Sequence, residues 1–261
     1  MKKRFCIASL LLLCLTSPWI AVAQTVILES PVRVVTSSDR SIFPESWLSP
    51  DINAEAEVLQ ESQIEPSRRV LYKVMKKYPG HILARNLETI YVLHRLKYKG
   101  ISASGTNSRR NVYVVNRGSR ERYTDAWIER TFHAEFSSKL LRNFPQYLDN
   151  DVWKKANVES FKYGVSGVKS VKQKKALKMF DPSLHAEGFL YAYAKSTLEN
   201  DFNSIAEQLF LGDSRFWSVV NKHQRIKEKT DLVIAFYHKI DPKFSRSFFV
   251  SLAEVESAEI G

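Results

Sequence analysis

The stretch that decides the fold runs from Tyr123 to Phe144 and reads YTDAWIERTFHAEFSSKLLRNF. Thr124 is a good N-cap for a helix, because its hydroxyl can accept a hydrogen bond from an otherwise unpaired backbone amide. Asp125 adds a negative charge at the positive end of the helix macrodipole. Pro145 cannot continue a helix, since it has no amide hydrogen and its ring clashes with the preceding turn. The sequence therefore predicts one long helix from about residue 124 to residue 143.

The segments before this helix show both helical and strand patterns. Apolar residues at helical spacing predict a helix that Pro79 and Gly80 stop, and short β-branched or aromatic runs predict strands. The expected elements are a helix at 66–78, strands at 90–93 and 111–116, a polar turn at 102–110, and strand candidates at 26–28 and 32–35. We interpret residues 24–64 as a lead-in segment that packs on a main domain of residues 65–261.

The segments after the long helix are mainly helical. Ser196 and Glu199 form a capping box for a helix at 198–211, and Gly212 is a suitable stop. Further helices are expected near residues 214–223, 230–239 and 242–254. A helix and two strands before the long helix, followed by a helical C-terminal half, indicate the α+β fold class.

The long helix resembles the active-site helix of secreted bacterial zinc peptidases of the zincin type, in their gluzincin branch. In that family an HExxH motif places two histidines one helical turn apart as zinc ligands, and the glutamate activates the metal-bound water. The motif is degenerate in this chain, because Ala134 and Ser138 occupy the two ligand positions. Only Glu135, which matches the catalytic general base, is present. The ordinary alternative for Glu135 is a solvated carboxylate on the helix surface.

The resemblance also has implications for the surroundings of the helix. Zincins have a strand that edges the cleft and pairs with substrate, and residues 111–116 match it in chain order. They take a third, acidic ligand from a later helix, for which Glu207 is the better match and Asp201 the second. The residues that the resemblance assigns to substrate binding are Asn111, Tyr113 and Tyr191. The family fold is a small sheet with an edge strand and a helical C-terminal half.

Three further residues have both a metal-binding and an ordinary interpretation. His133 lies about 100° around the helix from position 134 and about 140° from position 138, so it cannot replace either missing ligand. His133 could bind a metal together with Glu129, or it could form an i,i+4 hydrogen bond or ion pair with Glu129. His185 lies near two carboxylates and is either a metal ligand or a surface hydrogen-bonding residue. Glu207 could be a ligand or the partner of an arginine or lysine.

A basic segment from Lys154 to Lys178 contains eight lysines and a single acid, Glu159. Its glycines and like charges predict a mobile connection that is sensitive to proteases. Such a segment could attract an anionic envelope component through release of counterions. Few aromatic residues are interleaved with the lysines, and no known nucleic-acid module surrounds them, so a nucleic-acid partner is not expected.

Residues 1–23 have the pattern of a signal peptide, with a basic start, an apolar run and Ala21-Val22-Ala23 before Gln24. The whole chain has 39 Lys plus Arg and 28 Asp plus Glu, a net charge of +11, and only two cysteines, both within this segment. With 44% hydrophobic residues, the composition excludes a disordered, collagen-like or disulfide-framework protein. We expect export to the periplasm or the exterior, with no transmembrane segment after signal removal.

These observations predict an exported, metallopeptidase-like protein without catalytic activity or a bound cofactor, which binds a peptide or protein in the degenerate cleft. Two alternatives stay open. One is an active zinc peptidase with an atypical site that draws on His133, Glu135, His185 and Glu207. The other is a basic module that binds an anionic component of the envelope.

Overall fold

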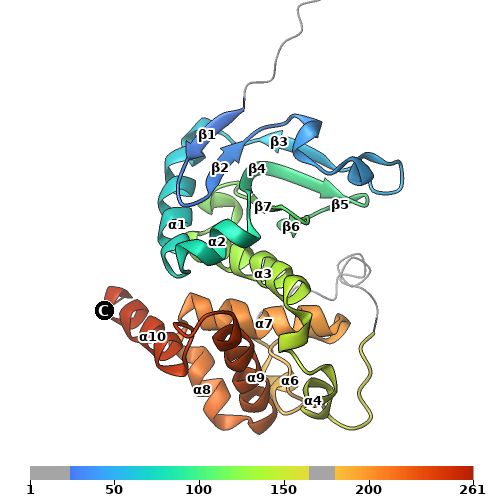
Figure 1. Cartoon of the computed structure of the whole chain (residues 1–261), viewed down its shortest axis with the longest axis vertical. Coiled ribbons are helices and arrows are strands. Elements are labelled where there is room, and N and C mark those ends of the chain that lie inside the picture. The colour runs from blue at the N-terminus through green and yellow to red at the C-terminus, as the bar shows by residue number, and fades with distance from the viewer. Residues whose placement is uncertain (1–23, 165–179, 261) are drawn as a thin grey trace, which may run out of the picture.

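The computed structural model describes residues 24–164 and 180–260, and the predicted signal peptide lies outside them. The chain has the predicted α+β class, with a mixed seven-stranded sheet in the N-terminal half and a mostly helical C-terminal half. Figure 1 shows the sheet at the top, a first layer of helices below it, and the remaining helices at the bottom.

The sheet has its two parallel interfaces in the middle and antiparallel strands at both ends. The strands are β1 (Thr25–Leu28), β2 (Arg33–Thr36), β3 (Glu55–Val58), β4 (Thr89–Tyr98), β5 (Ile101–Ser102), β6 (Gly105–Asn107) and β7 (Asn111–Val115). Their order is β1-β2-β4-β7-β6, and β3 and β5 pair with the second half of β4. Strands β2, β4 and β7 are parallel to one another.

The edge strand that lies beside α3 is β6, which corrects the prediction that residues 111–116 form this edge. Strand β7 pairs with β4 on one side and with β6 on the other, so it lies inside the sheet. The sequence predicts only a turn at 102–110, because three residues that include a glycine and two polar side chains carry no hydrophobic alternation. Pairing with the apolar strand β7 supplies the missing stabilisation.

The alternating residues of β4 and β7 divide between two cores. Ile90 and Val112 point to the helices, whereas Tyr91 and Tyr113 stack on the opposite face with ring centroids 5.3 Å apart. That second face is covered by the segment between β2 and β3, whose Phe43 ring lies 5.3 Å from Tyr113. Residues 24–64 therefore contribute three strands to the sheet and also the cover of its outer face.

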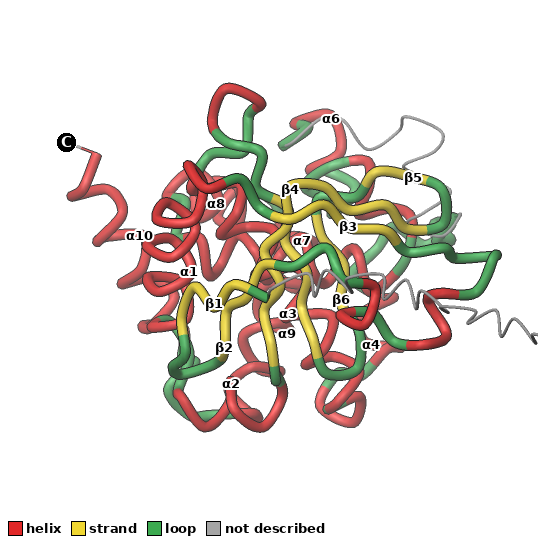
Figure 2. The backbone as a smooth tube through the Cα atoms, turned by 90° about the horizontal axis from the view of Figure 1, so that it is seen from above, coloured by secondary structure: helices red, strands yellow, loops and turns green. Residues whose placement is uncertain are grey.

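The helices predicted at 66–78, 124–143, 198–211 and 214–223 agree with the structure within two residues at each end. The helix at 224–240 begins six residues earlier than predicted, the last helix begins four and ends six residues later, and the short helices at 80–86, 150–155 and 182–185 are not among those predicted. The helices are α1 (Ile64–Lys76), α2 (Gly80–Asn86), α3 (Asp125–Asn143), α4 (Asn150–Lys155), α6 (Pro182–His185), α7 (Leu198–Leu211), α8 (Ser214–Lys222), α9 (Gln224–Ile240) and α10 (Arg246–Ile260). Helix α3 lies between the sheet and the helical half (Figure 1), where it packs on β6, β7 and α7. Seen from above, the strands lie over the helices (Figure 2).

The helix caps confirm one prediction and correct another. The Thr124 Oγ1 atom accepts a hydrogen bond from the Trp127 amide at 3.2 Å, as the sequence predicts for α3. Helix α7 is capped by Thr197, whose Oγ1 accepts from the Asn200 amide at 3.0 Å. Ser196 donates instead to the Tyr193 carbonyl, so the predicted capping box is wrong by one residue.

The first part of the basic segment is packed, contrary to the predicted mobile connection. Trp153 in α4 is fully buried, and the Phe161 ring packs against Phe189 with centroids 4.6 Å apart. The Tyr163 hydroxyl donates to Asp201 Oδ2 at 2.7 Å. The aromatic residues among the lysines therefore anchor residues 154–164 to the helical half, and residues 165–178 lie outside the described chain.

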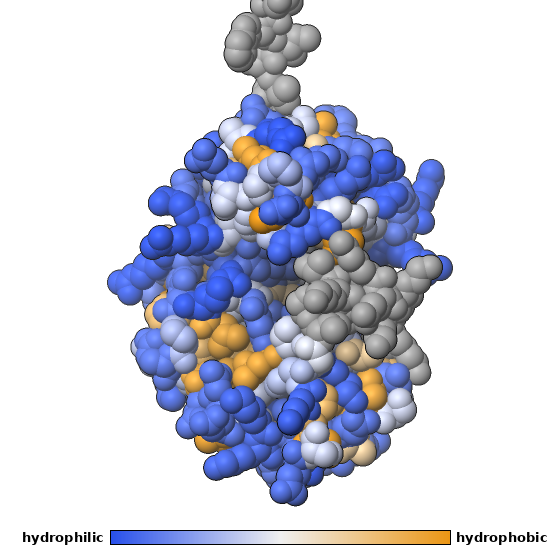
Figure 3. Space-filling model, turned by 90° about the vertical axis from the view of Figure 1, so that its right-hand side faces the viewer, coloured by the Kyte–Doolittle hydropathy of each residue, from blue (hydrophilic) through white to orange (hydrophobic). Residues whose placement is uncertain are grey.

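The surface is mainly hydrophilic in the view of Figure 3, with apolar side chains in patches over the helical half. Among the described residues, the large hydrophobic side chains that are exposed lie on separate elements: Val26, Val58, Tyr72 and Val152. No helix in this part of the chain is both long and apolar enough to cross a membrane.

Gly105 sets the distance between the edge strand and α3. A Cβ atom at this position would lie 2.6 Å from Thr131 Cγ2, 3.0 Å from the Tyr113 carbonyl oxygen and 3.1 Å from Glu135 Cγ. The Thr131 side chain cannot easily turn away, because its Oγ1 donates to the Trp127 carbonyl at 2.8 Å. Only glycine allows β6 to lie this close to the helix.

We predict that Gly105→Ala lowers the free energy of unfolding by about 1–3 kcal/mol, since the added methyl group overpacks this contact. Urea denaturation followed by circular dichroism measures the change. Gly80→Ala is the matched control, because a Cβ at residue 80 meets no atom within 4 Å. Equal unfolding midpoints for the two variants would contradict the proposed close contact.

Candidate functional site

Glu135 lies on α3 beneath the edge strand and is partly buried. Its Oε2 atom accepts a hydrogen bond from Asn107 Nδ2 on β6 at 2.5 Å. Burial is the main cause that raises the pKa of Glu135 to about 7; Asn107 opposes it, and the nearby Glu199 carboxylate adds to it. The carboxyl group therefore changes its charge near neutral pH, which is a property common at functional sites.

One face of α3 forms a polar seam with α7. Arg130, Ala134, Ser138 and Arg142 lie on this face, each one helical turn from the next. All but Ala134 pair with α7 residues that are also spaced one turn apart. The pairs are Arg130 with Glu207 at 3.6 Å, Ser138 with Asn203 at 2.6 Å, and Arg142 with Glu199 at 3.0 Å. The two positions that match zinc ligands in zincins therefore lie on the seam, next to Glu135.

These two positions do not fit a zinc ion. Ala134 has no ligand atom, and the hydroxyl of Ser138 already accepts a hydrogen bond from Asn203 Nδ2. Among the described residues, no group of three or more His, Cys, Asp or Glu side chains could hold a metal ion.

Glu207 lies on the seam, where it is paired with other groups. Its Oε1 atom accepts a hydrogen bond from the Tyr191 hydroxyl at 2.7 Å and lies 3.6 Å from Arg130. Burial raises the pKa of Glu207, whereas the Arg130 charge and the Tyr191 hydroxyl oppose the increase. The arginine pairing that the sequence leaves open is therefore present, and Tyr191, assigned by resemblance to substrate binding, is 6% exposed.

Asp201, the second choice for a third ligand, faces away from the seam. It is fully buried, and its Oδ2 atom accepts a hydrogen bond from Lys229 on α9 at 2.7 Å. A separation of six residues places Asp201 about 120° around α7 from Glu207, so the two carboxylates cannot serve the same site. Asp201 belongs instead to the core of the helical half.

His133 is fully buried on a different side of α3 from the seam. Its Nε2 atom lies 3.3 Å from Glu129 Oε1, and its Nδ1 atom lies 2.8 Å from the Tyr78 hydroxyl. Because a carboxylate only accepts, Nε2 carries the hydrogen and Nδ1 accepts from Tyr78. Burial is the main cause that lowers the pKa of His133 to about 4. The ordinary interpretation, an i,i+4 pair with Glu129, is the arrangement present.

His185 lies at the end of α6, away from α3 in the chain's helical half (Figure 1). Its ring centroid is 5.3 Å from that of His223, at the junction of α8 and α9. Burial and the His223 charge lower the pKa of His185. The structure therefore does not bring His185 together with Glu135.

The two proposed substrate-binding residues on β7 also have internal contacts. Tyr113 is fully buried on the outer face of the sheet, and its hydroxyl donates to the Ile42 carbonyl at 2.6 Å. Asn111 is partly buried at the start of the strand, where its Nδ2 atom lies 3.5 Å from the Tyr113 hydroxyl. Both side chains make contacts within the protein because β7 lies inside the sheet, between β4 and β6.

Sequence reasoning missed several polar residues around Glu135. Asn107 accepts a hydrogen bond from Arg142 and donates one to Glu135. Burial raises the pKa of Tyr193 to about 12, and the charge of Glu135 adds to the effect, so this phenol lies in the field of the same carboxylate. The i,i+4 spacing of Arg130, Ala134, Ser138 and Arg142 was the available signal for the seam.

Comparisons of the chain with protein-family models, with curated proteins and with solved structures gave no match.

Proposed function

We propose that this chain is an exported, zincin-like protein that binds an extended peptide along the free edge of β6 and has no peptidase activity of its own. The observation that carries the proposal is the position of an edge strand directly over Glu135. Among the described residues, no strand pairs with the outer edge of β6. A strand edge of this kind can add a peptide as a further strand, held by main-chain hydrogen bonds.

The hydrogen-bond pattern indicates which backbone groups of β6 are available. The Ser104 carbonyl accepts from the Val115 amide at 2.8 Å, and the Ser108 amide donates to the Asn111 carbonyl at 2.9 Å. Hydrogen-bonded pairs alternate with non-bonded pairs along an antiparallel ladder, so the backbone groups of Gly105 and Asn107 point away from β7. These groups are the expected contacts of the peptide.

The side chains around β6 would then provide specificity. Glu135 and Tyr193 offer groups that donate or accept hydrogen bonds, and Arg142, which is about half exposed, offers a cation. A carboxyl with a pKa of about 7 would make binding depend on pH in the neutral range.

The residues at the motif positions favour binding over hydrolysis. Ala134 cannot ligate a metal and the Ser138 hydroxyl accepts a hydrogen bond from Asn203, so these two positions do not supply the ligands of a metal that would activate a water beside Glu135. The alternative zinc site would require His133 and His185 beside Glu135, and their contacts are with Tyr78, Glu129 and His223 instead.

The test compares Asn107→Pro with Asn107→Ala. Both variants remove the side-chain bonds to Glu135 and Arg142, but only proline also removes the outward amide hydrogen. We expect peptides selected from a random display library on the wild-type chain to keep measurable affinity for Asn107→Ala. Asn107→Pro should weaken binding at least a further tenfold in fluorescence anisotropy, the loss expected for one main-chain hydrogen bond to a buried partner.

Two results would contradict this proposal. One is a library that yields no peptide enriched over an unrelated control protein. The other is equal binding by the proline and alanine variants. Cleavage of a selected peptide by the wild-type chain, abolished by Glu135→Gln, would instead support the active-peptidase alternative.

A further inference from the structure

A pocket lies between the C-terminal end of α2, the turn that joins β6 to β7, and the C-terminal end of α3. The charged residues that line it are Arg85, Glu88, Arg109 and Arg110. We call it the arginine pocket. Arg110 donates to Glu88, whereas the exposed side chains of Arg85 and Arg109 have no ion-pair partner among the described residues. Three guanidinium groups thus face a single carboxylate.

A buried lysine lies behind the same turn. Lys139 is 1% exposed, and its Nζ atom donates to the carbonyl oxygens of Ser108 at 3.0 Å and Arg109 at 2.7 Å. An ammonium group has three hydrogens to donate, so these two bonds leave one. No ion pair of Lys139 with a carboxylate occurs in the described part of the chain. A buried cation without an anionic partner is costly, so a nearby anion would stabilise it.

The positive charges also act on one another. Burial is the main cause that lowers the pKa of Lys139 to about 8, and the charges of Arg142 and Arg110 contribute. The C-terminal ends of α2 and α3 add only partial negative charge, about half a unit each. Lys139 and the three arginines of the pocket stand against the single carboxylate of Glu88, which leaves an excess of three positive charges before the partial charges of the helix ends are counted.

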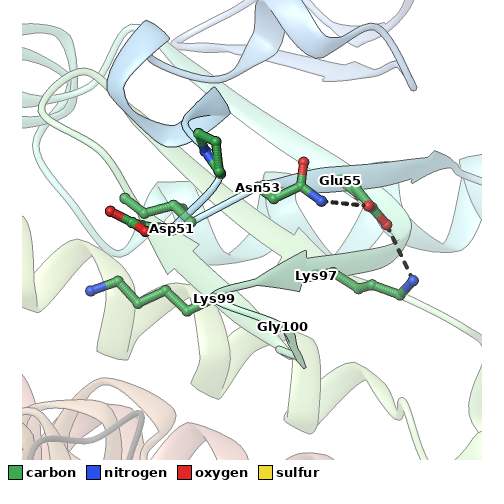
Figure 4. A pocket seen from close by; sticks show the side chains of 8 residues that line it. Asp51, Asn53, Glu55, Lys97, Lys99 and Gly100 are labelled. Atoms are coloured by element: carbon green, nitrogen blue, oxygen red, sulfur yellow. Dashed lines mark hydrogen bonds and ion pairs between the residues drawn. The ribbon is translucent and has the colours of Figure 1, made fainter.

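Another pocket among the described residues, called the second pocket below, has a different balance of charges. It lies beside β3 and the β4–β5 hairpin, where Asp51 and Glu55 stand against Lys97 and Lys99 (Figure 4). Glu55 accepts a hydrogen bond from Lys97 at 3.2 Å. The charges in that pocket cancel within the protein, which makes it a suitable control.

We propose that the arginine pocket binds the phosphate group of a phosphomonoester, either free or as the headgroup of a lipid. Guanidinium groups match phosphate oxygens in geometry and can bind them through two parallel hydrogen bonds. A phosphate dianion also offsets more of the excess charge than a single carboxylate does. This site does not depend on the peptide-binding proposal.

The first test is calorimetric titration of the chain with inorganic phosphate at low ionic strength, where screening is weak. We expect saturable binding that Arg85→Gln with Arg109→Gln weakens at least tenfold. Lys97→Gln with Lys99→Gln removes the same charge from the second pocket and should change the affinity less than twofold. All four side chains are exposed, and circular dichroism checks that both double variants fold.

A second measurement uses the unmodified chain. Phosphate should shift the amide resonances of Arg109, Arg110 and Asn143 and leave those of Lys97 and Lys99 in place. Vesicles of phosphatidylcholine with phosphatidic acid separate the two sources: co-sedimentation that free phosphate displaces supports a lipid headgroup, and its absence together with phosphate binding supports a soluble phosphate. No saturable binding, or equal losses in both double variants, would overturn the proposal.

Discussion

Lys229→Met is expected to lower the free energy of unfolding by about 3–5 kcal/mol, the loss typical when one partner of a buried ion pair is removed. Lys229 and Asp201 are both fully buried and 2.7 Å apart. The same ammonium donates to the Gly188 carbonyl at 2.7 Å and lies 3.9 Å from the Phe189 ring centroid. One side chain of α9 therefore holds α7 and the chain segment around residue 188 together.

The control lies on the same helix. Lys227 is about half exposed and lies 3.9 Å from Asp231, so Lys227→Met should change stability by less than about 1 kcal/mol. Adding Asp201→Asn to Lys229→Met removes the stranded carboxylate and should recover part of the loss. Urea denaturation followed by tryptophan fluorescence measures all three variants. Similar midpoints for Lys229→Met and Lys227→Met would show that the buried pair contributes little.

Glu135→Gln is expected to stabilise the protein above pH 7 by up to about 3 kcal/mol and to have little effect below pH 4.5. Burial first, with help from nearby carboxylates, raises the pKa of Glu135 from 4.5 to about 7 in the folded chain. Between these values the folded state holds a proton that the unfolded state has released. Wild-type stability therefore falls as pH rises through this window, whereas the neutral glutamine variant lacks the fall.

Glu129 provides a control of opposite sign on the same helix. Burial, the largest influence, opposes the change, but His133 and Lys77 together lower the pKa of Glu129 to about 2. Its contribution to stability is therefore present above pH 4.5 and lost as pH falls toward 2. At neutral pH the charge opposite Glu129 is the nearly buried Lys77 ammonium, so Glu129→Gln leaves this cation without its partner and should destabilise the chain by about 3 kcal/mol. Urea denaturation across the pH range tests both variants. The same sign for both at neutral pH would refute these assignments.

The α+β class and most elements could be predicted from the sequence. The cap at Thr124 and the stop at Pro145 mark α3, and Gly212 marks the end of α7, because these signals depend on residues within one helical turn. Strand β6 could not be predicted from such local signals. Gly105, Thr106 and Asn107 have no apolar pattern, and the strand exists because β7 and α3 lie beside it.

The same distinction between local sequence signals and tertiary contacts applies to the candidate site. The sequence by itself determined that Ala134 and Ser138 occupy the two helix positions that the resemblance to zincins assigns to zinc ligands, and that His133 lies on a different side of the helix from both, since helical spacing is a local property. Only the tertiary structure decided that β6 covers Glu135, that Glu207 faces α3 while Asp201 pairs with Lys229, and that His185 lies elsewhere. These contacts join residues far apart in the chain, and the packing that selects them also raises the pKa of Glu135, because desolvation depends on every element around a group and not on its neighbours in sequence.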